Sequence, residues 1–287
     1  MSDPSARPAP RIERLHRLLV REIPRFPNNR ASRDHMEAKP LGDLMIDYLS
    51  WRSRYVGVRP RTVTVEPAAR ATSTWNANGP AIEALIAKAK RGDDLTPHLS
   101  LKPHSQGYTP AARAPGAAAE ERWSDKDFIL NTMHYHHFHL GAHVEDKGHM
   151  ARTDEIVLAR VSRDAFDIVA IFDHEVFDHG SPERLRLWAI HDEIADRGTV
   201  PGTLAAGPMI ATSGHPLHLV LYANRCRKLI RELDSKLDQR GFMAGLYDEA
   251  SWPAPAKFKP EWLFDHLDFG IYDRAGKAMF LVAKGWN

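Results

Sequence analysis

Residues 155–172 read EIVLARVSRDAFDIVAIF and contain two apolar runs separated by a short polar segment. The runs at 155–161 and 166–172 have the length and the β-branched content that are typical of strands. Between them, Ser162, Arg163 and Asp164 are polar residues that suit a turn. The stretch therefore predicts a β-hairpin, with an antiparallel sheet around it.

The segments on both sides of this hairpin carry further helix and strand signals. Directly upstream, the run MHYHHFHL is strand-like, and Ser124 with Asp127 has the spacing of a capping box that starts a short helix. The other elements that we expect are helices at 11–23, 41–55, 79–92, 181–198 and 219–239, a strand at 61–66 and a second hairpin around 273–276. A meander flanked by helices predicts an α+β fold with a central, mostly antiparallel sheet.

Composition shifts along the chain suggest where domains begin and end. Residues 1–92 form a basic, helical N-terminal region, and residues 93–122 are poor in apolar side chains but rich in Pro, Ala and Gly. Such a segment is typical of a loop or linker. Residues 123–287 contain most of the histidines and the central hairpin. We therefore expect a histidine-rich α+β core domain there.

The overall composition is that of an ordinary soluble protein. The 287 residues include 39 Lys or Arg and 37 Asp or Glu, and 43% are hydrophobic. No apolar run is long enough to span a bilayer, and the first residues lack the apolar core of a signal peptide. The single cysteine, Cys226, falls on the apolar side of an expected helix. The sequence favours a cytoplasmic protein that has no membrane partner and a structural cysteine.

Positive charge is concentrated near the N-terminus. Residues 1–75 hold fourteen Lys or Arg against eight Asp or Glu. Arginine can bind phosphates with two hydrogen bonds, and aromatic rings can stack on bases, so RNA or another nucleic acid is the expected partner. The residues that we expect to form the nucleic-acid contact surface are Arg52, Arg54, Tyr55, Arg59 and Arg61.

Histidine is the most unusual feature of the chain, because six of the 16 histidines fall between His134 and His149. In a strand, His137 and His139 would lie on one face. Two imidazoles at this spacing can bind one metal ion, with Glu145 as a third ligand. The spacing of these three residues is similar to the first motif of cupins. A divalent metal is therefore one possible cofactor, and a metal-dependent enzyme is one possible function.

The same strand also suits metal-free chemistry on RNA, which needs cationic and titratable side chains around a phosphate. The segments HHFHLG, RTDEIVLARV and FDIVAIFDHEVF resemble three consecutive strands of RelE/ParE-like bacterial toxins over about 45 residues. The resemblance places His139 at a basic position of the first strand, Arg152 or Arg160 at the phosphate-facing position of the second, and His174 at the end of the third. We assign proton transfer to His139 and His174, phosphate stabilisation to Arg152 and Arg160, and an orienting role to His137. This chemistry needs no cofactor.

A second resemblance covers DKDFILN, HHFHLG and RTDEIVLARV, which look like an uncharacterised bacterial group with a DxxLN...HxHLG...RxxELLF pattern. Together these features favour a metal-independent endoribonuclease in a toxin or phage-defence setting, with an antitoxin or another protein as a possible partner. The alternatives are the metal-dependent enzyme and a non-catalytic interaction module.

Overall fold

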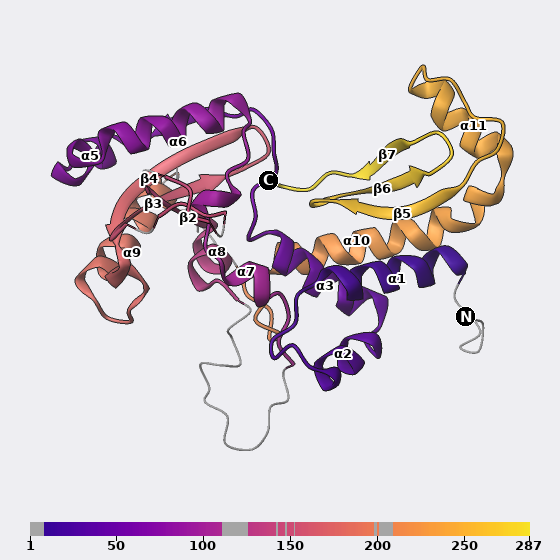
Figure 1. Ribbon diagram of the computed structural model, residues 1–287, viewed down its shortest axis with the longest axis horizontal. Coiled ribbons are helices and arrows are strands. Elements are labelled where there is room, and N and C mark those ends of the chain that lie inside the picture. Colours follow the sequence, from indigo (N-terminus) through magenta and orange to yellow (C-terminus); the bar gives the residue numbers. More distant parts are fainter. Residues whose placement is uncertain are drawn as a thin grey trace. The chain divides into compact units, whose positions relative to one another are not determined.

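The structure is a computed structural model, and it describes residues 9–110, 126–141, 143–146, 148–151, 153–197, 200 and 209–287 (Figure 1). It contains a four-stranded mixed sheet and a three-stranded antiparallel sheet, each accompanied by helices. The predicted α+β class is therefore confirmed. Within these residues, no helix is both long enough and apolar enough to cross a membrane.

The described residues divide into two compact units. The first unit comprises 9–52, 105–110 and 218–286, and the second comprises the described parts of 53–104 and 126–217 together with Asn287. This division differs from the expected boundaries at 92 and 123. The physical reason is that the two ends of the chain share one core, since the Arg11 guanidinium binds Asp234 at 3.0 Å and Asp238 at 2.7 Å.

The second unit is built on the four-stranded sheet, with strand order β1-β4-β3-β2. Its strands are β1 (Thr62–Val65), β2 (Tyr135–His139), β3 (Glu155–Val161) and β4 (Ala165–Asp173). The predicted hairpin is β3–β4, and β2 extends it in antiparallel pairing. β1 pairs with β4 in parallel, which makes the sheet mixed. β2 lies at the edge of the sheet, so among the described residues no strand pairs with the side of β2 that faces away from β3.

A β-bulge determines which side chains of the hairpin reach which face. The register shifts between Leu158 and Ala159. At this point β4 has one extra residue, Val169, which has no opposite residue in β3. Because a bulge moves the side-chain alternation by one position, Ile168 and Ile171 face the same core. β4 is thus buried on both faces, which explains its almost continuous apolar run.

Helices cover both faces of this sheet (Figure 1). α6 (Gly79–Arg91) packs its buried residues Ile82, Leu85 and Ile86 against one face, and α8 (Phe128–Met133) and α9 (Pro182–Asp196) pack against the other. α6 ends as predicted, because Gly92 adopts the left-handed conformation with φ of 78°. The short elements of this unit are α4 (Pro67–Arg70), α5 (Ser73–Ala77), η1 (Thr96–His98), α7 (Lys102–Ser105) and η3 (His174–Phe177).

The first unit combines the terminal parts of the chain. Its elements are α1 (Pro10–Glu22), α2 (Arg30–Glu37), α3 (Leu41–Arg52), α10 (Leu217–Leu233), η4 (Asp234–Asp238), α11 (Arg240–Glu249), β5 (Pro260–Asp265), β6 (Asp268–Asp273) and β7 (Ala278–Ala283). α1 buries Leu15 and Leu19 as its helical periodicity predicts. The three strands form a meander, and its β6–β7 turn is the second predicted hairpin.

One predicted helix is shorter than expected. The sequence predicts a continuous helix to residue 239, but α10 ends at Leu233 and is followed by η4. At this point Asp234 is buried and accepts hydrogen bonds from Trp262 Nε1 at 2.8 Å and from Arg11 Nε at 3.0 Å. A buried carboxylate requires such partners. We attribute the end of the helix to these tertiary bonds.

Candidate functional site

The second unit contains a pocket of about 270 Å³ beside the edge strand β2. Its apolar walls include Leu99, Pro103 and Phe177. The titratable residues that line it are Arg54, Lys102, Lys126, Asp127, His136, His137, His139 and His174. A concave site in which imidazoles and cationic side chains converge on apolar walls is the usual form of a ligand or active site.

The three histidines that the sequence predicted as a catalytic set lie in this pocket. The rings of His139 and His174 are stacked, with centroids 5.6 Å apart, and those of His137 and His139 are 6.0 Å apart. The strand period places His137 and His139 on one face of β2. His174 joins them from the start of η3, directly after β4.

The His174 ring has a defined tautomer in its neutral form. Its Nδ1 lies 2.9 Å from the backbone oxygen of Asp154. A carbonyl oxygen can only accept, so Nδ1 carries the proton and donates this bond. The other nitrogen, Nε2, is then the one that can exchange a proton with a ligand. The His174 side chain is exposed, so the bond to Asp154 gives a surface ring a fixed orientation.

A carboxylate lies beside the third histidine, His137. The distance from Asp127 Oδ2 to His137 Nδ1 is 3.6 Å. Burial lowers the pKa of His137, and the charge of Asp127 opposes this shift. Asp127 is itself held in place, because its Oδ1 caps α8 by accepting from the backbone N–H of Leu130 at 3.0 Å. The carboxylate therefore lies close to a largely neutral imidazole, at a distance too long for a direct hydrogen bond.

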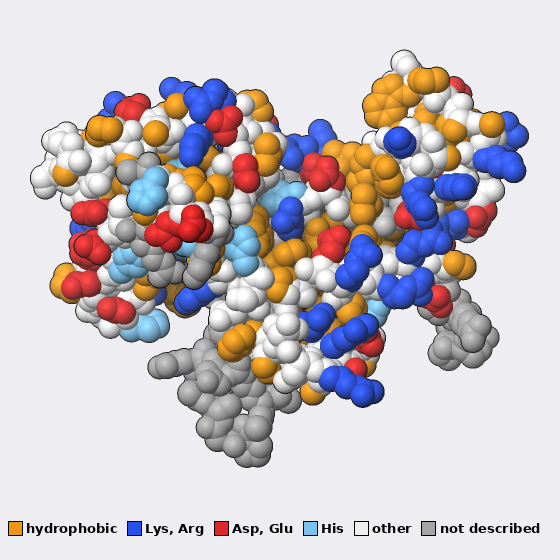
Figure 2. Space-filling model, in the orientation of Figure 1, with side chains coloured by type: hydrophobic (Ala, Val, Ile, Leu, Met, Phe, Trp, Pro, Cys, Tyr) orange, Lys and Arg blue, Asp and Glu red, His pale blue; other side chains and the backbone are white. Residues whose placement is uncertain are grey.

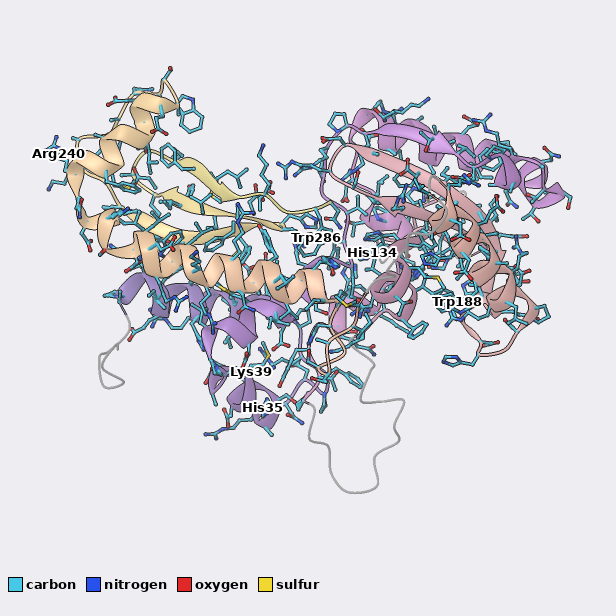
Figure 3. The ribbon with its side chains drawn as sticks, turned by 180° about the vertical axis from the view of Figure 1, so that it is seen from behind. His35, Lys39, His134, Trp188, Arg240 and Trp286 are labelled. Atoms are coloured by element: carbon cyan, nitrogen blue, oxygen red, sulfur yellow. The ribbon has the colours of Figure 1, made fainter. Side chains whose placement is uncertain are left out.

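The backbone between α8 and β2 brings these two residues together. α8 ends at Met133, and the next residue, His134 (labelled in Figure 3), adopts the left-handed conformation with φ of 60°. This conformation is unfavourable for residues other than glycine, and it reverses the chain so that β2 starts at Tyr135. The predicted capping box of Ser124 and Asp127 is wrong, because α8 begins at Phe128 and Asp127 is its N-cap. Ser124 lies outside the described residues.

A fourth histidine of the pocket, His136, is the most strongly perturbed. Its Nε2–H donates to the backbone oxygen of Ser53 at 2.9 Å, and only 4% of the residue is exposed. Burial lowers its pKa to about 4. His136 is therefore neutral at pH 7, and its ring serves to attach β2 to the segment that precedes β1.

The low pKa of His136 makes stability depend on pH. The native state resists protonation of His136, whereas the unfolded chain takes up this proton below about pH 6.5. The contribution of His136 to stability is therefore present above pH 6.5 and is lost as the pH falls toward 4. We expect unfolding of the second unit in urea to become easier by about 3 kcal/mol between pH 7 and pH 4. In His136→Gln this dependence should be weaker, whereas His179→Gln, which changes an exposed ring, should keep it. Equal slopes for wild type and His136→Gln would contradict the assignment.

Cationic side chains give the pocket a positive character. Arg54, Lys102 and Lys126 line it together with one carboxylate, Asp127. Arg54 is buried, whereas Lys102 is exposed at the start of α7. Three cations against one anion favour an anionic ligand such as a phosphate group.

Of the five residues predicted as a nucleic-acid surface, only Arg54 lines this pocket. Arg61 is buried, and its guanidinium donates to the backbone oxygens of Gly57, Arg59 and Ser162. The other three predicted residues are Tyr55, which is buried, Arg59, which is half-buried, and Arg52, which belongs to the first unit and lies over the Trp51 ring. Arg61 therefore has a structural role, because it is buried and its Nε and Nη1 bind those backbone oxygens.

The remaining predicted site residues lie elsewhere. Arg160 does not line the pocket and pairs with Asp167 at 3.3 Å, and Arg152 lies outside the described residues. Glu145, the expected third metal ligand, instead pairs with His149 at 3.1 Å. In the described parts of the chain, no three His, Cys, Asp or Glu side chains are grouped as a metal site.

Sequence reasoning missed several residues of this site. Lys102 falls in the segment that was expected to be a linker, and Asp127 was interpreted only as a helix-capping residue. The sequence gives no signal for His98. Its Nδ1 donates to the backbone oxygen of His139 at 2.8 Å, and its Nε2 lies 2.9 Å from Lys88 Nζ. His98 thus holds the end of β2. No local pattern marks it, because its partner is 41 residues away.

Comparisons of the chain with protein-family models, with curated proteins and with solved structures find no match. The resemblance to RelE/ParE-like toxins stays a prediction. The chemistry of the pocket must therefore be argued from its own residues.

Proposed function

We propose that the second unit cleaves RNA by metal-independent acid–base chemistry in the histidine pocket. The observation that carries this proposal is the stacking of His139 and His174, 5.6 Å apart, in a pocket that is also lined by Arg54, Lys102 and Lys126. Two imidazoles supply a base and an acid, and the cations supply charge for a phosphate.

The proposed reaction is an internal transfer at phosphorus. His139 is buried and acts as the base that removes the proton of the 2′-hydroxyl. The 2′-oxygen then bonds to phosphorus, and the bond from phosphorus to the 5′-oxygen breaks. His174 is exposed and, in its imidazolium form, gives the proton of its Nε2 to this leaving oxygen while Nδ1 keeps its proton on the Asp154 oxygen. The products are a 2′,3′-cyclic phosphate and a 5′-hydroxyl, so the atoms and protons balance without a cofactor.

The other polar residues would have supporting roles. Lys102 and Lys126 would stabilise the negative charge that grows on the phosphate oxygens in the transition state. These lysines take the role that the sequence assigned to Arg152 and Arg160. His137, which lines the pocket beside Asp127, would position the substrate as a neutral hydrogen-bonding ring, because burial lowers its pKa.

The cellular setting that we propose is that of a bacterial toxin or phage-defence ribonuclease in the cytoplasm, with an antitoxin or another protein as its inhibitor. It is supported by the likeness of β2, β3 and β4 to the three toxin strands, since these strands pair in the order and the antiparallel sense that a three-strand meander requires.

The test is cleavage of a labelled RNA oligonucleotide in excess chelator. We expect cleavage that persists in chelator and leaves a 2′,3′-cyclic phosphate, whereas DNA and 2′-O-methyl RNA of the same sequence stay intact because they lack the attacking hydroxyl. Cleavage that is lost in chelator and restored by one divalent metal would support the metal-dependent alternative. An inactive full-length protein would overturn the proposal.

A further inference from the structure

The first unit carries its own charged groove, which the proposed reaction does not use. It has a volume of about 1000 Å³ and is bounded by α1, α2, β5 and the β6–β7 turn. Six arginines and two glutamates line it. These residues are Arg14, Arg17, Arg21, Arg25, Arg33, Arg274, Glu37 and Glu261. The groove is therefore strongly basic.

A second groove continues the first one. It has a volume of about 950 Å³ and shares Arg14, Glu261 and Arg274 with the first. It adds Arg240, Lys257 and Lys259. We call the two together the basic groove. Figure 2 shows Lys and Arg side chains gathered over α1 and α2, and Figure 3 shows Arg240 projecting outward at the start of α11.

The carboxylates of the basic groove are already engaged within the protein. Glu37 binds Arg33 at 2.7 Å, and Glu261 binds Arg14 and also Arg274 at 3.1 Å. Asp234 and Asp238 both bind Arg11. Because each of these carboxylates already binds an arginine, it leaves the other cations of the groove available to an anionic ligand.

Several cations of the basic groove lack such a partner. In the part of the chain that the structure describes, Arg21, Arg240, Lys257 and Lys259 form no ion pair. Like charges held close together repel each other, and binding of an anion relieves this repulsion. A row of unpaired cations along a groove is suited to a polyanion rather than to a single small anion.

The length of the groove fits a nucleic-acid strand. α1 has 13 residues, which corresponds to a length of about 20 Å. In a double helix, where each strand has about 3.4 Å between successive phosphates along the axis, about six phosphates of one strand would lie beside α1. The aromatic residue of the first groove, Trp262, is only 2% exposed, so it cannot stack on a base. Phe258 of the second groove is half-buried and packs on the Tyr247 ring, with centroids 5.7 Å apart, so recognition would depend mainly on the phosphates.

We infer that the basic groove binds the phosphodiester backbone of RNA, without sequence preference and independently of the histidine pocket. This site lies in the first unit and so goes beyond the proposed function. Arginines suit it because each guanidinium can donate two hydrogen bonds to one phosphate.

The test measures binding of a fluorescent single-stranded 2′-O-methyl RNA, which the proposed reaction cannot cleave, to the full-length protein by anisotropy over a range of salt concentrations. The variant Arg21→Gln with Lys257→Gln removes one unpaired cation from each part of the groove. We expect it to bind about tenfold more weakly, and the slope of log K against log salt should fall by about 1.5, as for two lost phosphate contacts. The matched control, Arg225→Gln with Lys284→Gln, removes two exposed cations of the same unit that do not line the groove, and it should bind like wild type.

The outcomes separate this inference from the proposed function. Binding of RNA by the wild-type protein with no cleavage would overturn only the proposed reaction. Wild-type affinity in the groove variant, or an equal loss in the control, would overturn the groove. So would tighter binding to vesicles that contain phosphatidylserine than to RNA, because that result would indicate a membrane surface. DNA of the same length should bind similarly, since it offers the same phosphates.

Discussion

Replacing His139 or His174 with alanine is expected to lower the rate of RNA cleavage by about 10²- to 10⁴-fold, the usual contribution of a proton-transfer group. The two rings face each other in one pocket, so each should be needed to move one proton of the same reaction. The measurement is the single-turnover rate of cleavage in chelator, with saturating protein. If the two rings act as a pair, the double variant should be little slower than either single variant.

The controls for this prediction separate chemistry from folding. His139 is buried, so His139→Gln, which keeps a polar side chain of related size, should also be tested together with a melting curve. His174 is exposed, and His174→Ala should unfold at the wild-type temperature. His179→Ala removes another exposed histidine that does not line the pocket, and it should cleave normally. Losses below about tenfold in both active-site variants would exclude the proposed acid–base pair.

Local signals in the sequence were sufficient for many elements of the fold. The hairpin β3–β4 follows from two apolar runs and a polar turn, and α6 follows from a proline in its first turn and Gly92 at its end. These signals work because caps, turns and side-chain periodicity act over only a few residues. The α+β class could be predicted from such elements alone.

The division into units could not be predicted in this way. β1 pairs with β4 in parallel, with Thr62 opposite Ala165, and α1 binds η4 through Arg11 and Asp234. Both contacts join segments that are more than a hundred residues apart. No periodicity within a segment encodes its distant partner, so the expected boundaries at 92 and 123 followed composition instead of packing.

The candidate site shows the same limit. The alternation of β2 was enough to place His137 and His139 on one face. In contrast, Lys102 lies at the start of α7 and Asp127 directly before α8, and both line the pocket. Arg61 is buried, and backbone oxygens of neighbouring loops accept its hydrogen bonds. The residue types were recognisable in the sequence, but which of the arginines face a ligand depends on tertiary structure.

In the first unit, Asp273→Ala is expected to lower the free energy of unfolding by about 3–5 kcal/mol. Asp273 is fully buried at the end of β6. Its carboxylate accepts from Tyr247 Oη at 2.7 Å and from the backbone N–H of Lys259 at 2.6 Å, Ala275 at 3.2 Å and Gly276 at 3.3 Å. Alanine would leave the buried Tyr247 hydroxyl and three partly buried N–H groups without their acceptor, and each buried loss costs about 1–3 kcal/mol.

Urea unfolding followed by hydrogen exchange of peptides from 257–283 would measure this loss in the unit that contains it. Asp273→Asn keeps one carbonyl oxygen and should lose less than Asp273→Ala. Asp265→Ala removes an exposed carboxylate at the end of β5 and should change stability by no more than about 0.5 kcal/mol. A loss below about 1 kcal/mol in Asp273→Ala would mean that the four donors find other partners, and that the β6–β7 turn does not depend on this carboxylate.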